Sequence, residues 1–527
     1  MKFNWKASVS ALALAVSSGL QADVLPAYQA ESAWFTDAQT KIAEKLETNN
    51  NFRAKNVILF VGDGMGVSTL TASRIRKGQL AGEMGEEGYL AWERFPGTAL
   101  VKTYNVDAQT PDSAGTMTAM MSGLKTDVGV IGVDEDIVRG DCSTVVGNEA
   151  VTALELAEIK GLSTGVVSTA RITHATPAAT YAKSADRNWE DDGDMPEEAL
   201  TAGCTDIADQ LVHFEENLES RFTGIDVNGI DVVMGGGRRS FLPKDAAFNS
   251  TDAVSEVEGD RNDSRDLTAE WQEMYSDGVY ITDQAGFDGV DAAATTRLFG
   301  LFNESHMQYE ADRANDVAGE PSVAEMTTKA IDILDNNDKG FFLMVESGRI
   351  DHAHHAGNAS GALSETLALE AAIEAAVANT DPSETLILVT ADHGHVFTIA
   401  GYPKRGNPIL GKVVNVGADE PATAADDMPY TTVGYMNGYG FNDLGTETDS
   451  DAIYSEEVNA GRMDITAVDT TTPGYHQEAL IPLTSETHSG EDISLHGTGP
   501  GSQLIQGVIE QSVVFHLINQ SLGLLEE

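Results

Sequence analysis

Short runs of apolar, often β-branched residues alternate along this chain with stretches of helical periodicity. The clearest apolar runs cover residues 56–62, 163–169, 231–236, 341–347 and 384–394. They are apolar throughout rather than alternating with polar residues, which is typical of strands buried on both faces of a parallel sheet. Helical patterns lie near residues 66–78, 113–122, 151–160, 322–337, 361–379 and 503–520. The pattern predicts an α/β fold with a central, mostly parallel sheet sandwiched by helices.

Three segments interrupt this alternation. Residues 186–197 and 250–270 are acidic and are predicted to be loops. Residues 401–487 are rich in Gly, Thr, Asp and Tyr and contain few long apolar runs, which indicates a surface insertion. The sequence therefore predicts an α/β core over residues 23–400 and 488–527, with 401–487 inserted into it.

The first 22 residues have the layout of a secretory signal. Lys2 and Lys6 precede an apolar run from Ala7 to Val16, and small residues lead to Ala22. This layout predicts a signal peptide over residues 1–22 and a protein that is periplasmic or secreted. The alternative is a short buried N-terminal helix. No later stretch is long and apolar enough to suggest a bilayer span, so no membrane partner is predicted.

The net charge of −51 restricts the possible partners. Such a charge argues against binding to nucleic acid and to anionic membrane surfaces. Its self-repulsion has to be screened or neutralised by cations, which suggests a saline habitat. The alternative is an acidic exported protein that binds metals.

The chain contains two cysteines, Cys142 and Cys204. In an oxidising compartment two such residues can form one disulfide. The composition favours this bridge, with two free buried thiols as the alternative.

Metal-type ligands stand at the ends of three predicted strands. Asp63 follows residues 56–62, Glu346 lies within 341–347, and Asp392 and His393 follow 384–391. One carboxylate at a strand end is usually a helix cap. Ligands of open α/β sheets bind beyond the carboxyl ends of the strands, so three such ends can converge on one metal site.

Histidines form a second signal. Asp351 and His355 are four residues apart within 348–358, and they share a face if this turn is helical. Asp and neutral His are suitable zinc ligands, and His352 and His354 lie between them. The alternative is a solvated polar turn. His488 stands far along the chain and would be structural in isolation.

A serine and an arginine complete the candidate chemistry. Ser113 follows Pro111 and Asp112 at the predicted start of a helix, where free N–H groups favour an anion. In isolation Asp112 or Ser113 would be a helix cap. No Gly-x-Ser-x-Gly motif surrounds Ser113, so activation by a metal is preferred over a catalytic triad. Arg187 could bind two phosphate oxygens, or could be a salt-bridged loop residue.

These pieces occur together and in order, and they resemble the alkaline phosphatase family. The matching stretches are FVGDGMG (60–66), PDSAGTMTAM (111–120), STARITHATPAATYA (168–182), DRNW (186–189), VESGRIDHAHH (345–355), TADHGH (390–395) and THSGED (487–492). They span nearly the whole chain after residue 22. The resemblance implies a homodimeric phosphomonoesterase that forms a phosphoserine intermediate on a site with two Zn²⁺ and one Mg²⁺.

The resemblance also implies a role for each residue of the site. One zinc ion would be held by Asp351, His355 and His488. The second would be held by Asp63, Asp392 and His393, with Ser113 as its exchangeable ligand. Asp63 would also bridge to a magnesium site completed by Thr176 and Glu346. Arg187 would bind the substrate phosphate, with Asp112 and His352 beside it, and His174 and His395 would support the metal ligands.

Several positions distinguish branches of the family. His174 and His352 resemble the animal enzymes, where enterobacterial members have aspartate and lysine, and the separation of Cys142 and Cys204 resembles a disulfide of the animal branch. Asn303 stands where animal members have a glutamate that binds calcium, so no calcium site is predicted. The insertion 401–487 corresponds to the crown-like elaboration near the family's dimer interface. The competing functions are a sulfatase or phosphodiesterase of the same superfamily, and a phosphate-capturing protein without turnover.

Overall fold

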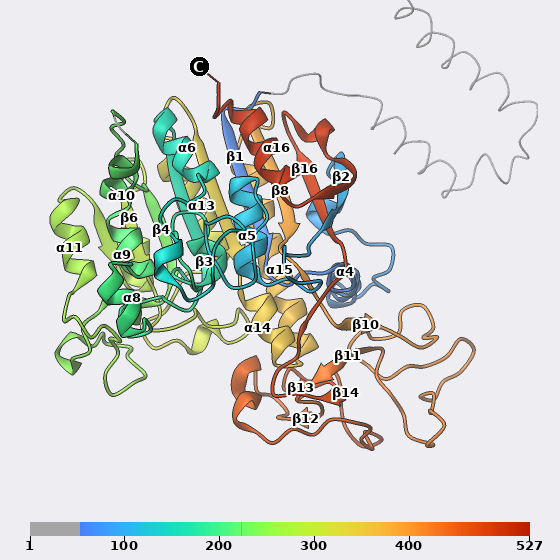
Figure 1. The fold of residues 1–527 in the computed structure, drawn as a ribbon. Helices are drawn as coiled ribbons and strands as arrows, with labels where there is room; N and C mark the ends of the chain where they lie inside the picture. The colour runs from blue at the N-terminus through green and yellow to red at the C-terminus, as the bar shows by residue number, and fades with distance from the viewer. Residues whose placement is uncertain (1–52, 223, 527) are drawn as a thin grey trace, which may run out of the picture. The chain divides into compact units, whose positions relative to one another are not determined.

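The computed structural model describes residues 53–222 and 224–526 (Figure 1). The predicted signal peptide over residues 1–22 lies outside this range and stays a prediction. In the part of the chain that is described, none of the helices combines the length and the apolar character that a bilayer span requires.

One large sheet organises the described residues. Its strands lie in the order β17-β2-β16-β8-β1-β7-β3-β4-β6-β5. Strand β16 is antiparallel to both neighbours, β2 and β8, and the other adjacent pairs are parallel. The strands are β1 (Asn56–Gly62), β2 (Gly97–Lys102), β3 (Ser163–Arg171), β4 (Val232–Gly236), β5 (Val279–Ile281), β6 (Leu298–Leu301), β7 (Phe341–Ser347), β8 (Thr385–Ala391), β16 (Ile493–Thr498) and β17 (Gln506–Glu510). The prediction of a mostly parallel sheet is confirmed.

The central strands are buried because helices cover both faces. Every residue of β1, β7 and β8 is buried, as their continuous apolar sequences predicted. Helices α4 (Val67–Leu80), α13 (Val323–Leu334) and α15 (Ala359–Asn379) pack together on one face. Helices α5 (Ser113–Ser122), α6 (Ala153–Lys160) and α16 (Val513–Leu522) cover the face turned to the viewer in Figure 1.

Local sequence signals set several helix boundaries. A capping box of Thr152 and Glu155 begins α6, and Ser322 and Glu325 begin α13 in the same way. Smaller helices surround the core: α7 (Ala175–Ala178), α8 (Glu197–Ala202), α9 (Ile207–Val212), α10 (Phe214–Arg221), α11 (Leu267–Met274), α12 (Gln284–Gly289) and α14 (Arg349–His355).

The predicted helix over residues 503–520 is wrong in its first half. Residues 506–510 form β17, which pairs in parallel with β2 at the edge of the sheet, and α16 begins at Val513. Gly507 has a φ of 77°, which an α-helix does not accommodate, and the β-branched Val508 and Ile509 favour a strand.

Residues 401–487 contain mainly loops and short strands. Strand β11 (Val433–Gly438) pairs with β14 (Ala479–Pro482) and with β10 (Phe397–Ile399), which precedes the predicted insertion. Strand β12 (Asn442–Asp443) pairs with β13 (Tyr475–His476), and β15 (His488–Ser489) pairs with β9 (Gly394–His395). The boundaries at 401 and 487 stay a prediction.

Candidate metal and phosphate site

The carboxyl ends of three adjacent strands bring the predicted acidic residues together. Strand β1 lies between β8 and β7, and Gly62 is in register with Ala391 and Ser347. Because the strands are parallel, Asp63 and Asp392 leave the sheet at the same level, beside Glu346. All three carboxylates are fully buried. The predicted convergence of strand ends is present in the structure.

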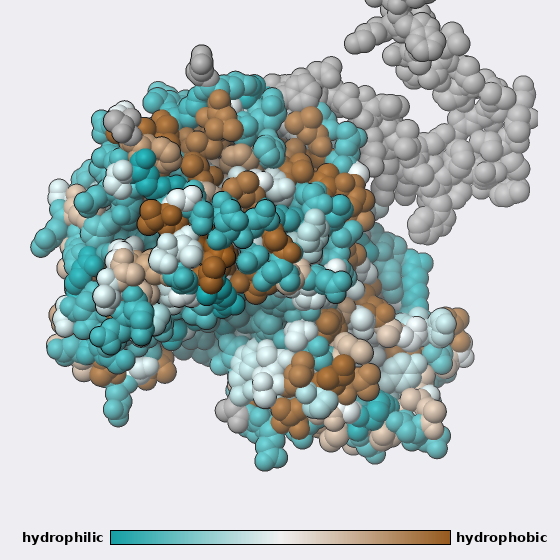
Figure 2. All heavy atoms as spheres, in the orientation of Figure 1, coloured by the Kyte–Doolittle hydropathy of each residue, from teal (hydrophilic) through white to brown (hydrophobic). Residues whose placement is uncertain are grey.

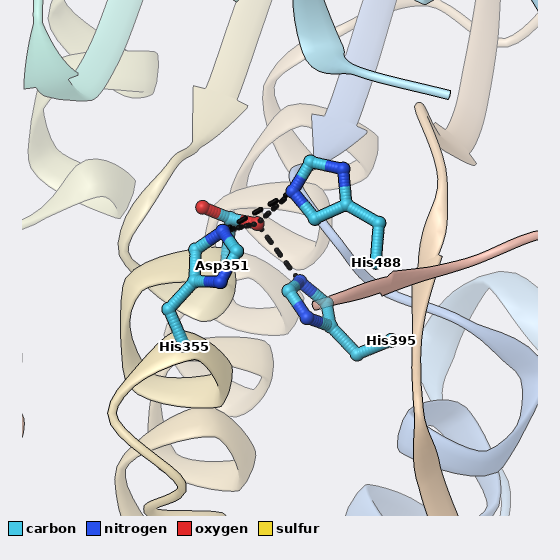
Figure 3. A group of neighbouring side chains, drawn as sticks. All are labelled: Asp351, His355, His395 and His488. Carbon is cyan, nitrogen blue, oxygen red and sulfur yellow. Dashed lines mark hydrogen bonds and ion pairs between the residues drawn. The ribbon is translucent and has the colours of Figure 1, made fainter. Parts of the chain in front are cut away.

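Asp351, His355, His395 and His488 form a first group with ligand atoms within 4.8 Å of one another. Asp351 and His355 share one face of α14, with His355 Nε2 3.3 Å from Asp351 Oδ1. His488 is the cross-strand partner of His395 between β15 and β9, which brings this distant residue to the site. Figure 3 shows the three imidazole rings directed at the Asp351 carboxylate.

The hydrogen bonds of this group set which nitrogen of two rings faces the other candidate ligands. His355 Nδ1 donates to the carbonyl of Glu486 at 2.6 Å, and His488 Nδ1 donates to the carbonyl of Pro111 at 2.8 Å. In the neutral tautomer with this proton on Nδ1, the lone pair lies on Nε2. These two Nε2 atoms lie 3.1 Å apart and both face Asp351 Oδ1. Burial lowers the pKa of His355 to about 4, which keeps its ring neutral. Such a cluster of acceptors fits a bound cation.

His395 differs from the other two histidines. Its Nε2 lies 2.8 Å from Asp351 Oδ1 and its Nδ1 lies 2.5 Å from Glu486 Oε2. Burial disfavours a charge on this ring, but Glu486 and Asp351 outweigh that effect and raise the pKa of His395 to about 10. With a proton on each nitrogen, His395 has no lone pair for a metal and instead holds Asp351 in place.

Asp63, Asp392 and His393 form a second group around Ser113. Ser113 Oγ donates to Asp63 Oδ1 at 3.3 Å and lies 3.0 Å from His393 Nε2. Within the described residues, Asp63 Oδ2 and Asp392 Oδ2 are buried without hydrogen-bond partners. Burial raises the pKa of both acids, and their mutual repulsion raises that of Asp63 further. A cation at this position would satisfy both oxygens and keep both acids ionised.

Asp63 also belongs to a third group with His174 and Glu346. Thr176 Oγ1 and Glu346 Oε1 are buried, and neither has a hydrogen-bond partner in the described part of the chain. Burial raises the pKa of Glu346 to about 7. Hydroxyl and carboxylate oxygens are the ligands that Mg²⁺ prefers, so this group fits a hard cation. His174, predicted to support the ligands, lies among the candidate ligands themselves.

Ser113 occupies the first turn of α5, and Asp112 caps that helix. One oxygen of Asp112 accepts from Gly115 N at 3.1 Å, and the other accepts from Arg187 Nη1 at 3.0 Å. Although burial alone would raise the pKa of Asp112, Arg187 and the backbone N–H donors lower it below its ordinary value. Asp112 is therefore both a helix cap and a partner of Arg187, which the sequence had offered as separate possibilities.

His352 lies beside these groups. Its ring packs against His306, with centroids 4.1 Å apart, and against His174 at 5.6 Å. Its Nδ1 lies 3.0 Å from Arg349 Nη1, and Arg349 pairs with Asp451 of the insertion at 2.9 Å. The structure thus connects the site to residues 401–487 through His352.

Cys142 and Cys204 form a disulfide, as predicted. It joins the short helix η2 (Cys142–Thr144) to the residue that follows the Gly203 cap of α8. Trp189 and Ala185, which flank Arg187 in the chain, belong to the same small hydrophobic cluster as Cys142.

Sequence reasoning missed four polar residues around the site. Glu486 holds His395, Ser168 Oγ donates to Glu346, and Glu190 and His306 both contact Arg171. Glu190, His306 and Glu486 stand in polar segments, and Ser168 lies near the end of the predicted strand 163–169, so their types alone carry no signal. The hints available were that Ser168 begins the stretch 168–182, and that Glu190 and Glu486 directly adjoin the stretches 186–189 and 487–492.

The chain matches known proteins along most of its length. A family model described as alkaline phosphatase matches residues 54–524. The chain is 41% identical over 513 residues to the human tissue-nonspecific alkaline phosphatase isozyme, covering 96% of this chain and 91% of that protein. It is 39% identical over 496 residues to an alkaline phosphatase of Gadus morhua, covering 93% and 97%.

Solved structures share the fold. The alkaline phosphatase of Thermus thermophilus superposes with a TM-score of 0.62 at 23% identity, covering 95% of this chain and 96% of that chain. The cold-active enzyme of a psychrophilic Shewanella gives a TM-score of 0.58 at 22% identity, covering 90% of this chain and 100% of that chain.

Proposed function

The chain belongs to the alkaline phosphatase family, and from this premise we propose that it hydrolyses phosphate monoesters through a phosphorylated Ser113 on a site for two Zn²⁺ and one Mg²⁺. The observation that carries the proposal is the position of Ser113. Its Oγ lies between Asp63 and His393, at the positive end of a helix and beside the Arg187–Asp112 pair.

The three groups of acidic and histidine residues supply the places for the ions. Asp351, His355 and His488 would hold one zinc ion, and Asp63, Asp392 and His393 would hold the other. Glu346, Thr176 and Asp63 would hold magnesium, with His174 near enough to act directly or through water. When bound, such ions lower the pKa of a hydroxyl or water and stabilise the attacking and leaving oxygens of an in-line displacement.

The chain's own residues then perform two substitutions at phosphorus. In the first, the Ser113 Oγ–P bond forms and the bond from phosphorus to the substrate alcohol breaks; Ser113 loses a proton and the alcohol gains one. In the second, water attacks phosphoserine, inorganic phosphate leaves, and Ser113 regains its proton. Arg187 binds the phosphoryl oxygens with its planar guanidinium, and the N–H groups of α5 stabilise their charge.

Hydrolysis of p-nitrophenyl phosphate tests this function. We expect turnover with zinc and magnesium, loss of turnover with a chelator, and no turnover after Ser113→Ala. Ser220→Ala, which changes an exposed serine of α10, is the matched control. Hydrolysis of p-nitrophenyl sulfate or of bis(p-nitrophenyl) phosphate, without turnover of the monoester, would instead indicate a sulfatase or a phosphodiesterase. Tight phosphate binding without turnover would indicate a phosphate-capturing protein.

We also propose that the protein is exported and forms a homodimer. The residues 1–22 support export, and retention of this segment in the mature protein would refute it. Exposed apolar residues on the insertion support self-association; Leu480 is 68% and Met436 49% exposed, and hydrophobic side chains are visible on this part of the surface in Figure 2. A single-subunit mass in solution would refute the dimer.

The acidic composition supports a saline habitat, with the bound-metal alternative still open. Unfolding measured against salt concentration separates them, because full stability in dilute buffer would contradict the saline proposal.

A further inference from the structure

Arg187 lies on an acidic loop in which three consecutive carboxylates are buried. The loop covers residues 186–197, and Glu190, Asp191 and Asp192 within it are 7%, 2% and 9% exposed. Burying a carboxylate is costly unless it is paired and hydrogen-bonded. These residues therefore serve as internal anchors rather than as a solvated surface, and Glu190 is three residues from Arg187.

Glu190 connects the loop to the end of β3. Arg171, the last residue of β3, donates to Glu190 through Nε at 2.8 Å and through Nη2 at 2.6 Å. Thr173 Oγ1 donates to the same carboxylate at 2.6 Å. This two-point pairing of guanidinium and carboxylate restricts orientation as well as distance.

The other terminal nitrogen of the Arg171 guanidinium, Nη1, begins a series of side-chain contacts that ends at Arg187. Arg171 Nη1 lies 2.6 Å from His306 Nε2, and the His306 ring packs edge-on against His174 at 5.5 Å between centroids. His174 Nε2 in turn lies 3.2 Å from Arg187 Nη2. These contacts therefore form a closed path. It runs from Arg187 through the side chains of His174, His306, Arg171 and Glu190, and it returns to Arg187 along three residues of backbone.

We propose that Glu190 is a positioning residue that fixes Arg187 for phosphate binding, with Arg171 as its partner. This inference rests on the proposed function, in which Arg187 binds the phosphoryl group. Arg187 has a long side chain, and a ligand site gains affinity when such a chain is held in its binding geometry beforehand. Asp112 orients one end of the guanidinium; the Glu190–Arg171 pair fixes the backbone that carries it and the His174 ring that faces its other end.

A double-mutant cycle with inorganic phosphate as a competitive inhibitor tests the inference, using the metal-loaded enzyme. Glu190→Gln keeps the shape of the side chain but removes its charge. We expect it to raise the inhibition constant about tenfold, within the usual range of coupling between linked residues. In an Arg187→Ala background the same substitution should change that constant less than about twofold, because its effect passes through Arg187.

The control is Glu197→Gln, which neutralises an exposed carboxylate at the end of the same loop and should leave phosphate inhibition unchanged. Equal effects of Glu190→Gln in both backgrounds, or none in either, would overturn the inference. If Glu190→Gln does not fold, Thr173→Val decides by the same cycle: an increase of about threefold that Thr173→Ser restores supports it, and no increase refutes it. Unchanged phosphate inhibition after Arg187→Ala would instead contradict the proposed role of Arg187.

Discussion

Glu486→Gln removes one charge behind the first metal group and leaves the shape of the side chain intact. Glu486 accepts from His395 Nδ1 at 2.5 Å and from Val396 N at 2.8 Å, and His395 in turn holds Asp351. A glutamine can keep the contact with Val396 through its oxygen, and its amide N–H can donate to His395 Nδ1 once that nitrogen has lost its proton. The pKa of His395 should then fall, because the nearby carboxylate that raises it is gone.

The expected loss of zinc affinity follows from the hydrogen bonds that change. A charge-assisted hydrogen bond is roughly twice as strong as a neutral one, so neutralising Glu486 weakens the support of Asp351 by about 1.4 kcal/mol. That corresponds to about a tenfold weaker zinc affinity at the Asp351–His355–His488 group, in line with other outer partners of metal ligands. Glu486→Ala leaves two buried N–H donors unpaired and should cost ~3 kcal/mol or more in folding stability.

Zinc competition with a coloured chelator, together with activity at buffered free zinc, measures this affinity. Glu478→Gln is the matched control, because Glu478 also pairs with a cation and a backbone N–H, but within the insertion. We expect unchanged zinc binding in the control. The reasoning fails if Glu486→Gln binds zinc as tightly as the parent, or if the control loses as much affinity.

Three further predictions follow from the same structure. Removing the disulfide by Cys142→Ser and Cys204→Ser should lower the free energy of unfolding by about 4 kcal/mol, because the bridge closes a loop with a sequence separation of 62 residues. Denaturant unfolding measures this change, and an unchanged free energy of unfolding would contradict it. In the metal-free protein the pKa of Glu346 is about 7, so the folded state holds a proton that the unfolded state releases at lower pH. The contribution of Glu346 to stability should therefore fall as pH rises from about 4.5 to about 7; Glu346→Gln should remove that part of the slope in thermal unfolding, and an unaltered slope would refute the assignment. His174→Asp should tighten magnesium binding, since a carboxylate is a harder ligand than imidazole, and an unchanged magnesium titration would oppose this.

The fold, the convergence of the strand-end carboxylates and the Asp351–His355 pair were predictable because their signals are local, whereas the places of His488 and Thr176 in the metal groups came only from the family resemblance. Continuous apolar runs are typical of buried parallel strands, and the carboxyl ends of parallel strands lie at the same edge of the sheet. The predicted limits of α5 at residues 113 and 122 agree with the structure, because the Asp112 cap begins the helix and Gly123, with a φ of 79°, ends it. Asp351 and His355 could be paired because they are one helical turn apart.

The rest depends on tertiary burial that a local pattern does not reveal. Glu190 and Glu486 stand in polar segments and appeared as ordinary surface residues in the sequence, yet each is buried against a cationic partner. His306 gave no signal because the residues it contacts lie 46 or more positions away in the chain. The strand β17 was missed because its place at the sheet edge depends on pairing with β2, more than 400 residues earlier.

The most direct test of the account is to trap the covalent intermediate. The metal-loaded enzyme is mixed with a phosphate monoester, quenched in acid within a single turnover and digested, and the peptide that contains Ser113 is analysed by mass spectrometry. We expect one added phosphoryl group on Ser113, absent without metal and absent in Ser113→Ala. Turnover without phosphorylation of Ser113, or with the phosphoryl group on another residue, would contradict it.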